Sequence, residues 1–170
     1  MDQRQSSFLS LYRPVHDRFE RFCRARVFGI MDHRDLIHDT LLIAFEKFDR
    51  PTCEKAFLSF LCGIALRVLS NHRRKRKEVG FPDGMPEIAG ELRSDHSSEV
   101  YLLHKALSKL PDAQRESLIL FEIAGFSVRE IAGIHEVSEP VVRQRLVRGR
   151  KKLAQILAPE FSITCKGQES

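Results

Sequence analysis

The stretch FSVREIAGIHEVSEPVVRQRLVRGRKKL, from Phe126 to Leu153, carries the clearest helix signals in the chain. Ser127 can cap a helix over 128–134, and Glu130, three residues later, completes a capping box. Ser138 supplies the next N-cap, and apolar residues then recur at the spacing of one helix face. The sequence therefore predicts a short helix, a tight turn and a longer second helix.

This order of elements matches the helix-turn-helix plan, in which the second helix lies in the major groove of DNA. Upstream, Pro111 opens a further helix that Gly125 ends. Arginine can pair with guanine and glutamine with adenine, while other cations suit phosphates. The alternative is an ordinary solvated helix face. We expect the following residues to bind DNA: Ser138, Arg143, Gln144, Arg148 and Lys151.

The N-terminal half also shows helical spacing. Apolar residues recur every three or four positions within 36–48 and again within 57–69, so each run places them on one face. Pro51 separates the two runs and prevents the first helix from continuing unbent. Strand alternation is seen in neither half, so the sequence predicts an all-α protein.

Charge divides the chain into blocks. The segments Arg67–Lys77 and Arg143–Lys152 each hold six Lys or Arg side chains, whereas 78–97 is acidic and rich in Gly, Pro and Ser. We therefore expect two small helical bundles joined by a flexible linker. The predicted boundaries are 1–77 for the first domain, 78–97 for the acidic linker, 98–158 for the second domain and 159–170 for a tail.

Bulk composition excludes several classes of protein. Hydrophobic residues at 42% and charged residues at 30% are typical of a globular protein, and no apolar run approaches the roughly 18 residues that span a bilayer. The charged N-terminus lacks a signal-peptide core, so we expect a cytoplasmic protein without membrane insertion. The net charge of +5 mildly favours a polyanionic partner.

No catalytic or metal-binding pattern is visible in the sequence. The four cysteines never occur at zinc-site spacing, which predicts free thiols, and His33 and His38 do not share a helical face. Gly-rich phosphate loops, HExxH and Ser-His-Asp sets are missing from the sequence. We therefore expect neither an enzyme nor a protein that needs a cofactor or metal.

Three segments, about 120 of the 170 residues, resemble the sigma-70 family in its extracytoplasmic-function (ECF) subgroup. DLIHDTLLIAFEKF (Asp35–Phe48) is similar to the family's region 2 pattern DLVQETFLxxF. FLSFLCGIALRVLSNHRRKRK (Phe57–Lys77) is similar to its FxxWLxxIARNxxxDxxRRxxR, and Leu107–Leu153 resembles its region 4. The resemblance implies a transcription initiation factor that directs core RNA polymerase to promoters by recognising minus-10 and minus-35 DNA.

The resemblance also implies partners and contact residues. Asp35, His38 and Asp39 fall where family members contact the clamp of the polymerase's largest subunit, and region 4 implies a contact with the flap of the second subunit. An anti-sigma factor is implied as a further partner. The loop 49–55 corresponds to the one that captures a flipped minus-10 base. The surface that grips the separated strands corresponds to Arg73, Arg74, Lys75, Arg76 and Lys77.

Departures from the family pattern keep an alternative open. Arg67 and Asn71 stand where the family has Asn and Asp, and Glu136 stands at its turn Gly. The alternative is a degenerate sigma-like interaction protein that binds polymerase or an anti-sigma factor without opening DNA. A stand-alone dimeric helix-turn-helix regulator is a third hypothesis, which the acidic linker and the separate N-terminal module disfavour.

Overall fold

The structure is a computed structural model that describes residues 2–49, 53–80 and 98–166. All regular secondary structure in these residues is helical, and they contain no strand. The predicted all-α class is therefore confirmed. The chain divides into two compact units, Met1–Ile88 and Ala89–Ser170. The division falls within the predicted linker, and residues 81–97 of that linker lie outside the described part of the chain.

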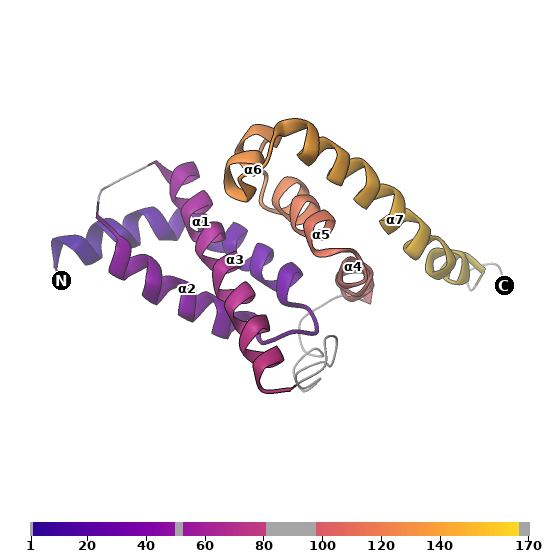
Figure 1. The fold of residues 1–170 in the computed structure, drawn as a ribbon, viewed down its shortest axis with the longest axis horizontal. Helices are drawn as coiled ribbons and strands as arrows, with labels where there is room; N and C mark the ends of the chain where they lie inside the picture. Colours follow the sequence, from indigo (N-terminus) through magenta and orange to yellow (C-terminus); the bar gives the residue numbers. More distant parts are fainter. Residues whose placement is uncertain (1, 50–52, 81–97, 167–170) are drawn as a thin grey trace. The chain divides into compact units, whose positions relative to one another are not determined.

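Three helices form the first unit: α1 (Gln3–Val27), α2 (His33–Lys47) and α3 (Glu54–Glu78), each packed against the other two (Figure 1). Aromatic rings dominate its core. The Phe8 ring meets Phe45, Phe48 and Phe57 edge-to-face, with centroids 5.4, 5.4 and 5.3 Å away. The apolar runs within 36–48 and 57–69 thus become the buried faces of α2 and α3.

Arg4 joins the start of α1 to the end of α2. Its guanidinium donates to the carbonyl oxygens of Phe45 (2.6 Å), Glu46 (2.9 Å) and Phe48 (3.2 Å), and it lies over the Phe45 ring. Carbonyl groups at a helix C-terminus have no partner within the helix, so a guanidinium there satisfies several at once. This contact fixes the position where α2 ends.

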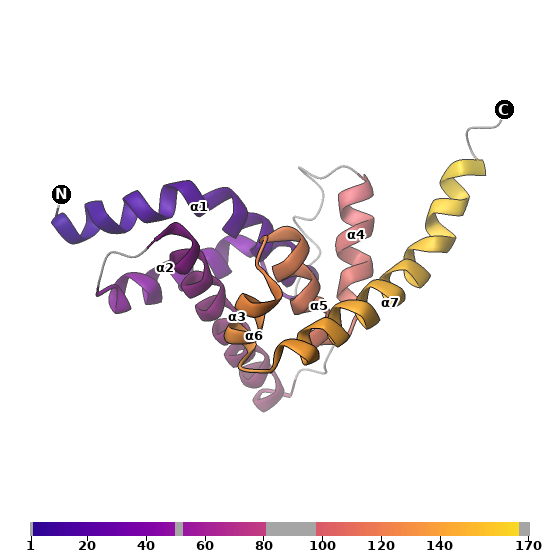
Figure 2. The same ribbon diagram turned by 90° about the horizontal axis from the view of Figure 1, so that it is seen from above.

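The second unit contains α4 (Ser98–Ser108), α5 (Asp112–Leu118), the π-helical turn η1 (Ile119–Ile123), α6 (Val128–His135) and α7 (Glu139–Lys166) (Figure 2). The helix predicted after Pro111 is therefore α5 followed by η1, and Gly125 has a left-handed φ of 79° just beyond it. The helix α6 matches the predicted 128–134 closely. By contrast, α7 passes through Pro159, so the helix continues beyond the boundary predicted at 158.

Gly149 permits a close approach between α7 and α5. A Cβ atom at this position would lie 2.9 Å from Cδ1 and 3.2 Å from Cγ of the buried Leu118. At Gly133 in α6, nothing lies within 4 Å of such an atom. A side chain at position 149 would therefore crowd Leu118, whereas one at position 133 would meet no neighbour.

Replacing each glycine by alanine is expected to change the stability of the second unit in opposite directions. Gly133→Ala gains helix propensity of about 1 kcal/mol. Gly149→Ala meets an overpacking cost of about 1–3 kcal/mol. Hydrogen exchange of the α5 and α7 amides would measure both effects, with Gly133→Ala serving as the matched control. Equal stabilisation by the two variants would contradict the close packing at Gly149.

None of the helices within the described ranges is both long and apolar enough to cross a membrane.

Candidate nucleic-acid and polymerase interfaces

The second helix of the helix-turn-helix, α7, has a buried and an exposed side. Val142, Leu146 and Gly149 are buried, and α7 packs against α5 and α6. The predicted DNA-binding residues on the helix are all exposed: Arg143, Gln144, Arg148 and Lys151. Gln144, Arg148 and Lys151 follow one another at four and three residues and so share one face. Ser138 is exposed directly before the helix.

Three of the six cations in Arg143–Lys152 are held by neighbouring side chains. Arg143 forms an ion pair with Glu139 at 3.0 Å, and Arg150 pairs with Glu122 at 2.9 Å while its guanidinium lies over the Phe121 ring. Arg145 contacts His135 at 3.4 Å. Among the residues whose side chains are described, Arg148, Lys151 and Lys152 form no ion pair with a carboxylate. The free cationic surface of α7 is therefore smaller than the sequence suggests.

The start of α6 is capped by the serine that the sequence predicts for it. The Ser127 hydroxyl oxygen accepts a hydrogen bond from the Glu130 backbone N–H at 3.2 Å, which caps α6. Glu136 ends the helix with φ 55° and ψ 43°, and among the described residues it alone is a non-glycine with positive φ. That conformation costs a side-chain-bearing residue about 1–2 kcal/mol. The position at which the family pattern has glycine is thus left-handed in this chain.

The basic end of α3 lies at the surface of the first unit. Arg74, Lys75 and Lys77 are exposed, whereas Arg73 and Arg76 are half-buried. Cations in the last turn of a helix also complement its dipole, so part of this cluster has a structural reason to be there. Exposure at the surface nonetheless puts Arg74, Lys75 and Lys77 where a phosphate backbone can approach them.

Two of the departures from the family pattern lie on the exposed side of α3. Arg67 and Asn71 are both exposed and stand four residues apart. The side-chain oxygen of Asn71 accepts a hydrogen bond from Arg74 at 3.1 Å. Positions 67, 71 and 74 therefore form one stripe, to which the substitution at 67 adds a cation.

The predicted polymerase-binding residues lie together on α2. Asp35, His38 and Asp39 are exposed on one side, whereas Leu36, Thr40 and Ala44 are buried on the other. Leu42 was not among the predicted contact residues, yet it is 56% exposed and stands three and four residues after Asp39 and His38. Its position outside the apolar seam of 36–48 is the signal that would have identified it. We call Asp35, His38, Asp39 and Leu42 the α2 face.

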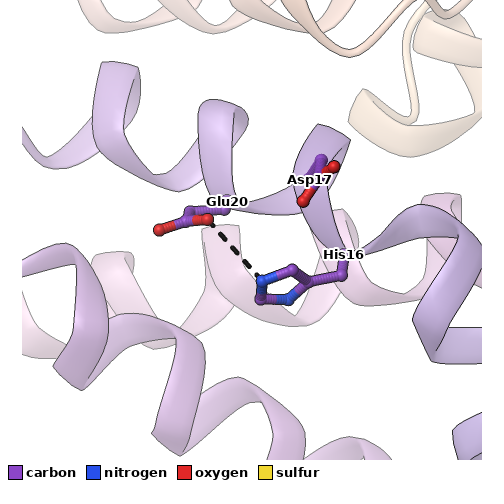
Figure 3. A group of neighbouring side chains, drawn as sticks. All are labelled: His16, Asp17 and Glu20. Atoms are coloured by element: carbon purple, nitrogen blue, oxygen red, sulfur yellow. Dashed lines mark ion pairs between the residues drawn. The ribbon is translucent and has the colours of Figure 1, made fainter.

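His16, Asp17 and Glu20 on α1 bring their ligand atoms within 4.8 Å of one another (Figure 3). The His16 Nε2 atom lies 3.6 Å from Glu20, and the Tyr12 hydroxyl contacts His16 Nδ1 at 2.8 Å. Burial raises the pKa of Tyr12 to about 12, so its hydroxyl keeps its proton and can donate it. Arg24 donates to the other Glu20 oxygen at 2.9 Å. Because the Arg24 guanidinium occupies that oxygen, we interpret these side chains as an ion-pair network.

His33 links this network to the start of α2. Its Nε2 atom lies 3.7 Å from Glu20, and its Nδ1 atom lies 3.5 Å from Asp32. Burial, and then the charge of Arg24, lower the pKa of His33. Burial alone would raise the pKa of Glu20, but the hydrogen bond from Arg24 and the nearby positive charges lower it overall.

Acid is expected to destabilise the first unit partly through His33. Because the pKa of His33 is lowered in the folded chain, the unfolded chain binds that proton more readily, so stability falls as the pH drops below about 6.5. Glu20 adds a second loss below about 4.5. Urea unfolding followed by circular dichroism at pH 7.5 and 5.5 should show a larger drop for the native chain than for His33→Gln. Equal drops would show that His33 does not contribute.

The cysteines with described side chains match the expectation of free thiols. Cys23 and Cys62 are fully buried and Cys53 is exposed, all three unpaired with one another. Burial raises the pKa of the Cys23 and Cys62 thiols. Both therefore stay protonated and unreactive at neutral pH.

Comparison with known proteins identifies the family. The family model described as "Sigma-70, region 4" matches residues 101–153, which include the helix-turn-helix. The ECF RNA polymerase sigma factor EcfG of Rhodopseudomonas palustris is 33% identical over 128 residues, covering 72% of this chain and 70% of the relative. The RNA polymerase sigma factor NccH of Alcaligenes xylosoxydans xylosoxydans is 31% identical, covering 78% of each chain.

Solved structures agree with these relatives. The sigma factor RpoE from Bartonella quintana, solved in complex with the anti-sigma factor NepR, is 25% identical with a TM-score of 0.71, covering 89% of this chain and 96% of RpoE. CnrH, solved in complex with the cytosolic domain of CnrY, is 26% identical with a TM-score of 0.65, covering 91% and 90%. The all-α fold, the helix-turn-helix and the sequence relatives lead to one conclusion: the chain belongs to the sigma-70 family, as an ECF sigma factor, and is a transcription initiation factor rather than an enzyme.

Proposed function

We propose that this chain binds core RNA polymerase through the α2 face and reads promoter DNA through α7 and the basic end of α3. The observation that carries the proposal is the exposed side of α7. There, Gln144, Arg148 and Lys151 share one face within the segment that matches region 4. Glutamine and arginine on one exposed helix face can read base edges in the major groove, and lysine can neutralise phosphate.

The α2 face supports the proposed contact with the polymerase. Two carboxylates flank His38, and an exposed leucine lies one turn further along the helix. Interfaces combine apolar anchors with charges that are complementary to the partner. We therefore assign Asp35, His38 and Asp39 to the clamp of the largest subunit, and the second unit to the flap of the second subunit.

Promoter recognition divides between the two units in this proposal. The second unit reads minus-35 DNA, and the first unit engages minus-10 DNA with Arg73–Lys77 and the loop 49–55, of which 50–52 lie outside the described residues. The stripe formed by Arg67, Asn71 and Arg74 supports contact with the DNA backbone. The same stripe departs from the family pattern, which keeps open a second function: binding polymerase without opening DNA.

The proposal also includes a regulatory partner that inhibits the chain. Two structures similar to this chain were solved with an anti-sigma factor or with the cytosolic domain of CnrY bound. An anti-sigma factor is therefore the regulatory partner we propose here too. Because bacterial polymerase works in the cytoplasm, the proposal places the chain there.

Transcription in vitro with core polymerase tests the proposed function. We expect product from a supercoiled promoter selected by sequencing DNA bound to the reconstituted enzyme. Product only from a template with a pre-opened minus-10 bubble would favour the second function. An absence of product from either template would contradict promoter-directed initiation.

A further inference from the structure

One imidazole connects α5, α6 and α7 of the second unit. His135, the last residue of α6, points its Nε2 atom at Glu116 of α5, 3.5 Å away, and its Nδ1 atom at Arg145 of α7, 3.4 Å away. The His135 side chain is only 9% exposed, and that of Glu116 is 20% exposed. A charge change at this position would therefore occur where solvent screens it poorly.

The two residues that contact His135 indicate which protonation state of its ring fits this geometry. A guanidinium can only donate hydrogen bonds, so Nδ1 has to accept from Arg145. The proton of the neutral ring then lies on Nε2, where it faces the Glu116 carboxylate. A doubly protonated ring would instead direct an N–H group at the guanidinium. The Arg145 contact is thus available only to neutral His135.

Arg145 lies between residues that define the orientation of α7. Its neighbours Val142 and Leu146 are buried, whereas Arg143, Gln144 and Arg148 are exposed, and Arg145 itself is half-buried. A contact that holds Arg145 against α6 therefore adds a polar restraint on the rotation of α7 about its own axis, in addition to the packing of its buried residues. That rotation decides whether the exposed side chains meet base edges within hydrogen-bonding distance.

We propose that neutral His135 is a positioning residue for promoter reading, which holds Arg145 and thereby orients the DNA-facing side of α7. This inference rests on the proposed reading of DNA by α7. Protonation replaces the hydrogen bond by repulsion from Arg145 and strengthens the attraction to Glu116, so the ring is drawn from α7 toward α5. Promoter affinity therefore falls on acidification, and the charges that face the ring come from α5 and α7.

Two substitutions separate positioning from simple packing. In His135→Gln, the amide oxygen can accept from Arg145 and the amide N–H can donate to Glu116, but the side chain does not titrate. In His135→Leu, neither contact can form. We expect the glutamine variant to bind DNA as the native chain does at pH 7.8 and the leucine variant to bind at least about fivefold more weakly, a typical coupling between sites.

The experiment measures promoter affinity of the reconstituted holoenzyme by fluorescence anisotropy at pH 7.8 and 5.8, with circular dichroism to check folding. From pH 7.8 to 5.8, the native affinity should fall at least about fivefold more than that of His135→Gln. Parallel pH profiles for these two proteins would overturn the inference, as would native-like binding by His135→Leu. Nitrogen NMR of the imidazole should show the Nε2–H tautomer at pH 7.8, and the Nδ1–H tautomer would also overturn it.

If the proposed function itself were wrong, the same experiment would give a different result. In that case the native holoenzyme would show no promoter preference at pH 7.8, which removes the basis of the inference as well. Promoter-specific binding with parallel pH profiles would leave the proposed function standing and remove only the role of His135.

Discussion

Replacing Arg148 and Lys151 together by alanine is expected to lower promoter affinity of the holoenzyme about 30- to 1,000-fold. Both side chains are exposed on the side of α7 that we propose to face DNA, and neither forms an ion pair within the described part of the chain. A well-formed arginine–guanine pair contributes about 1–3 kcal/mol, and each neutralised phosphate adds to it. Electrophoretic mobility shifts on promoter DNA would measure the loss.

The control for this prediction removes the same charge elsewhere in the second unit. Lys105 and Lys109 are exposed outside α7, and their double alanine variant should bind promoter DNA within about twofold of the native chain. Affinity for core polymerase should be unchanged in both double variants. An equal loss of DNA affinity in the two would mean that net charge, and not the α7 face, controls binding.

Replacing Asp35 and Asp39 together by asparagine is expected to weaken binding to core polymerase about 10- to 100-fold. The two carboxylates flank His38 on the exposed side of α2, and truncating one partner of a buried interfacial charge pair costs about 2–5 kcal/mol, less at a rim. Asparagine keeps the side-chain shape, so the helix should stay folded. Titration of fluorescently labelled chain with core polymerase would give the affinity.

Asp17→Asn is the control for the α2 face, because Asp17 is an exposed carboxylate on α1. It should leave polymerase binding within about twofold of the native value. Leu42→Ala tests the apolar part of the face and should weaken binding without changing the dependence on salt. A normal affinity for Asp35→Asn/Asp39→Asn would rule out these carboxylates as the main polymerase contact.

Helix caps and apolar periodicity predicted those parts of the fold that depend on residues close together in the sequence. Ser127 caps α6 because its hydroxyl needs only the backbone three residues away, and the apolar seams of α2, α3 and α7 follow from helical periodicity. The helix α1 was not predicted, because charged residues interrupt its apolar positions. Its burial depends on aromatic contacts such as Phe8 with Phe57, 49 residues away in sequence.

The position of the candidate site could be predicted from the sequence. Which of its cationic side chains pair with other residues could not. Exposure of the predicted residues on α2 and α7 follows from their positions off the apolar seams. The pairing of Arg150 with Glu122, 28 residues apart, depends on how α7 packs against α5, which η1 directly follows. The contact of Arg145 with His135 likewise depends on the turn at Glu136. Such long-range contacts decide which cations remain available to DNA.

Site-specific photocrosslinking within a promoter complex tests the central claim most directly. A benzoylphenyl side chain at position 38 on α2 should crosslink to the largest polymerase subunit, and one at position 144 on α7 should crosslink to minus-35 DNA. If position 144 instead crosslinked only to protein, or position 38 only to DNA, the assignment of the two helices to polymerase and promoter would be wrong.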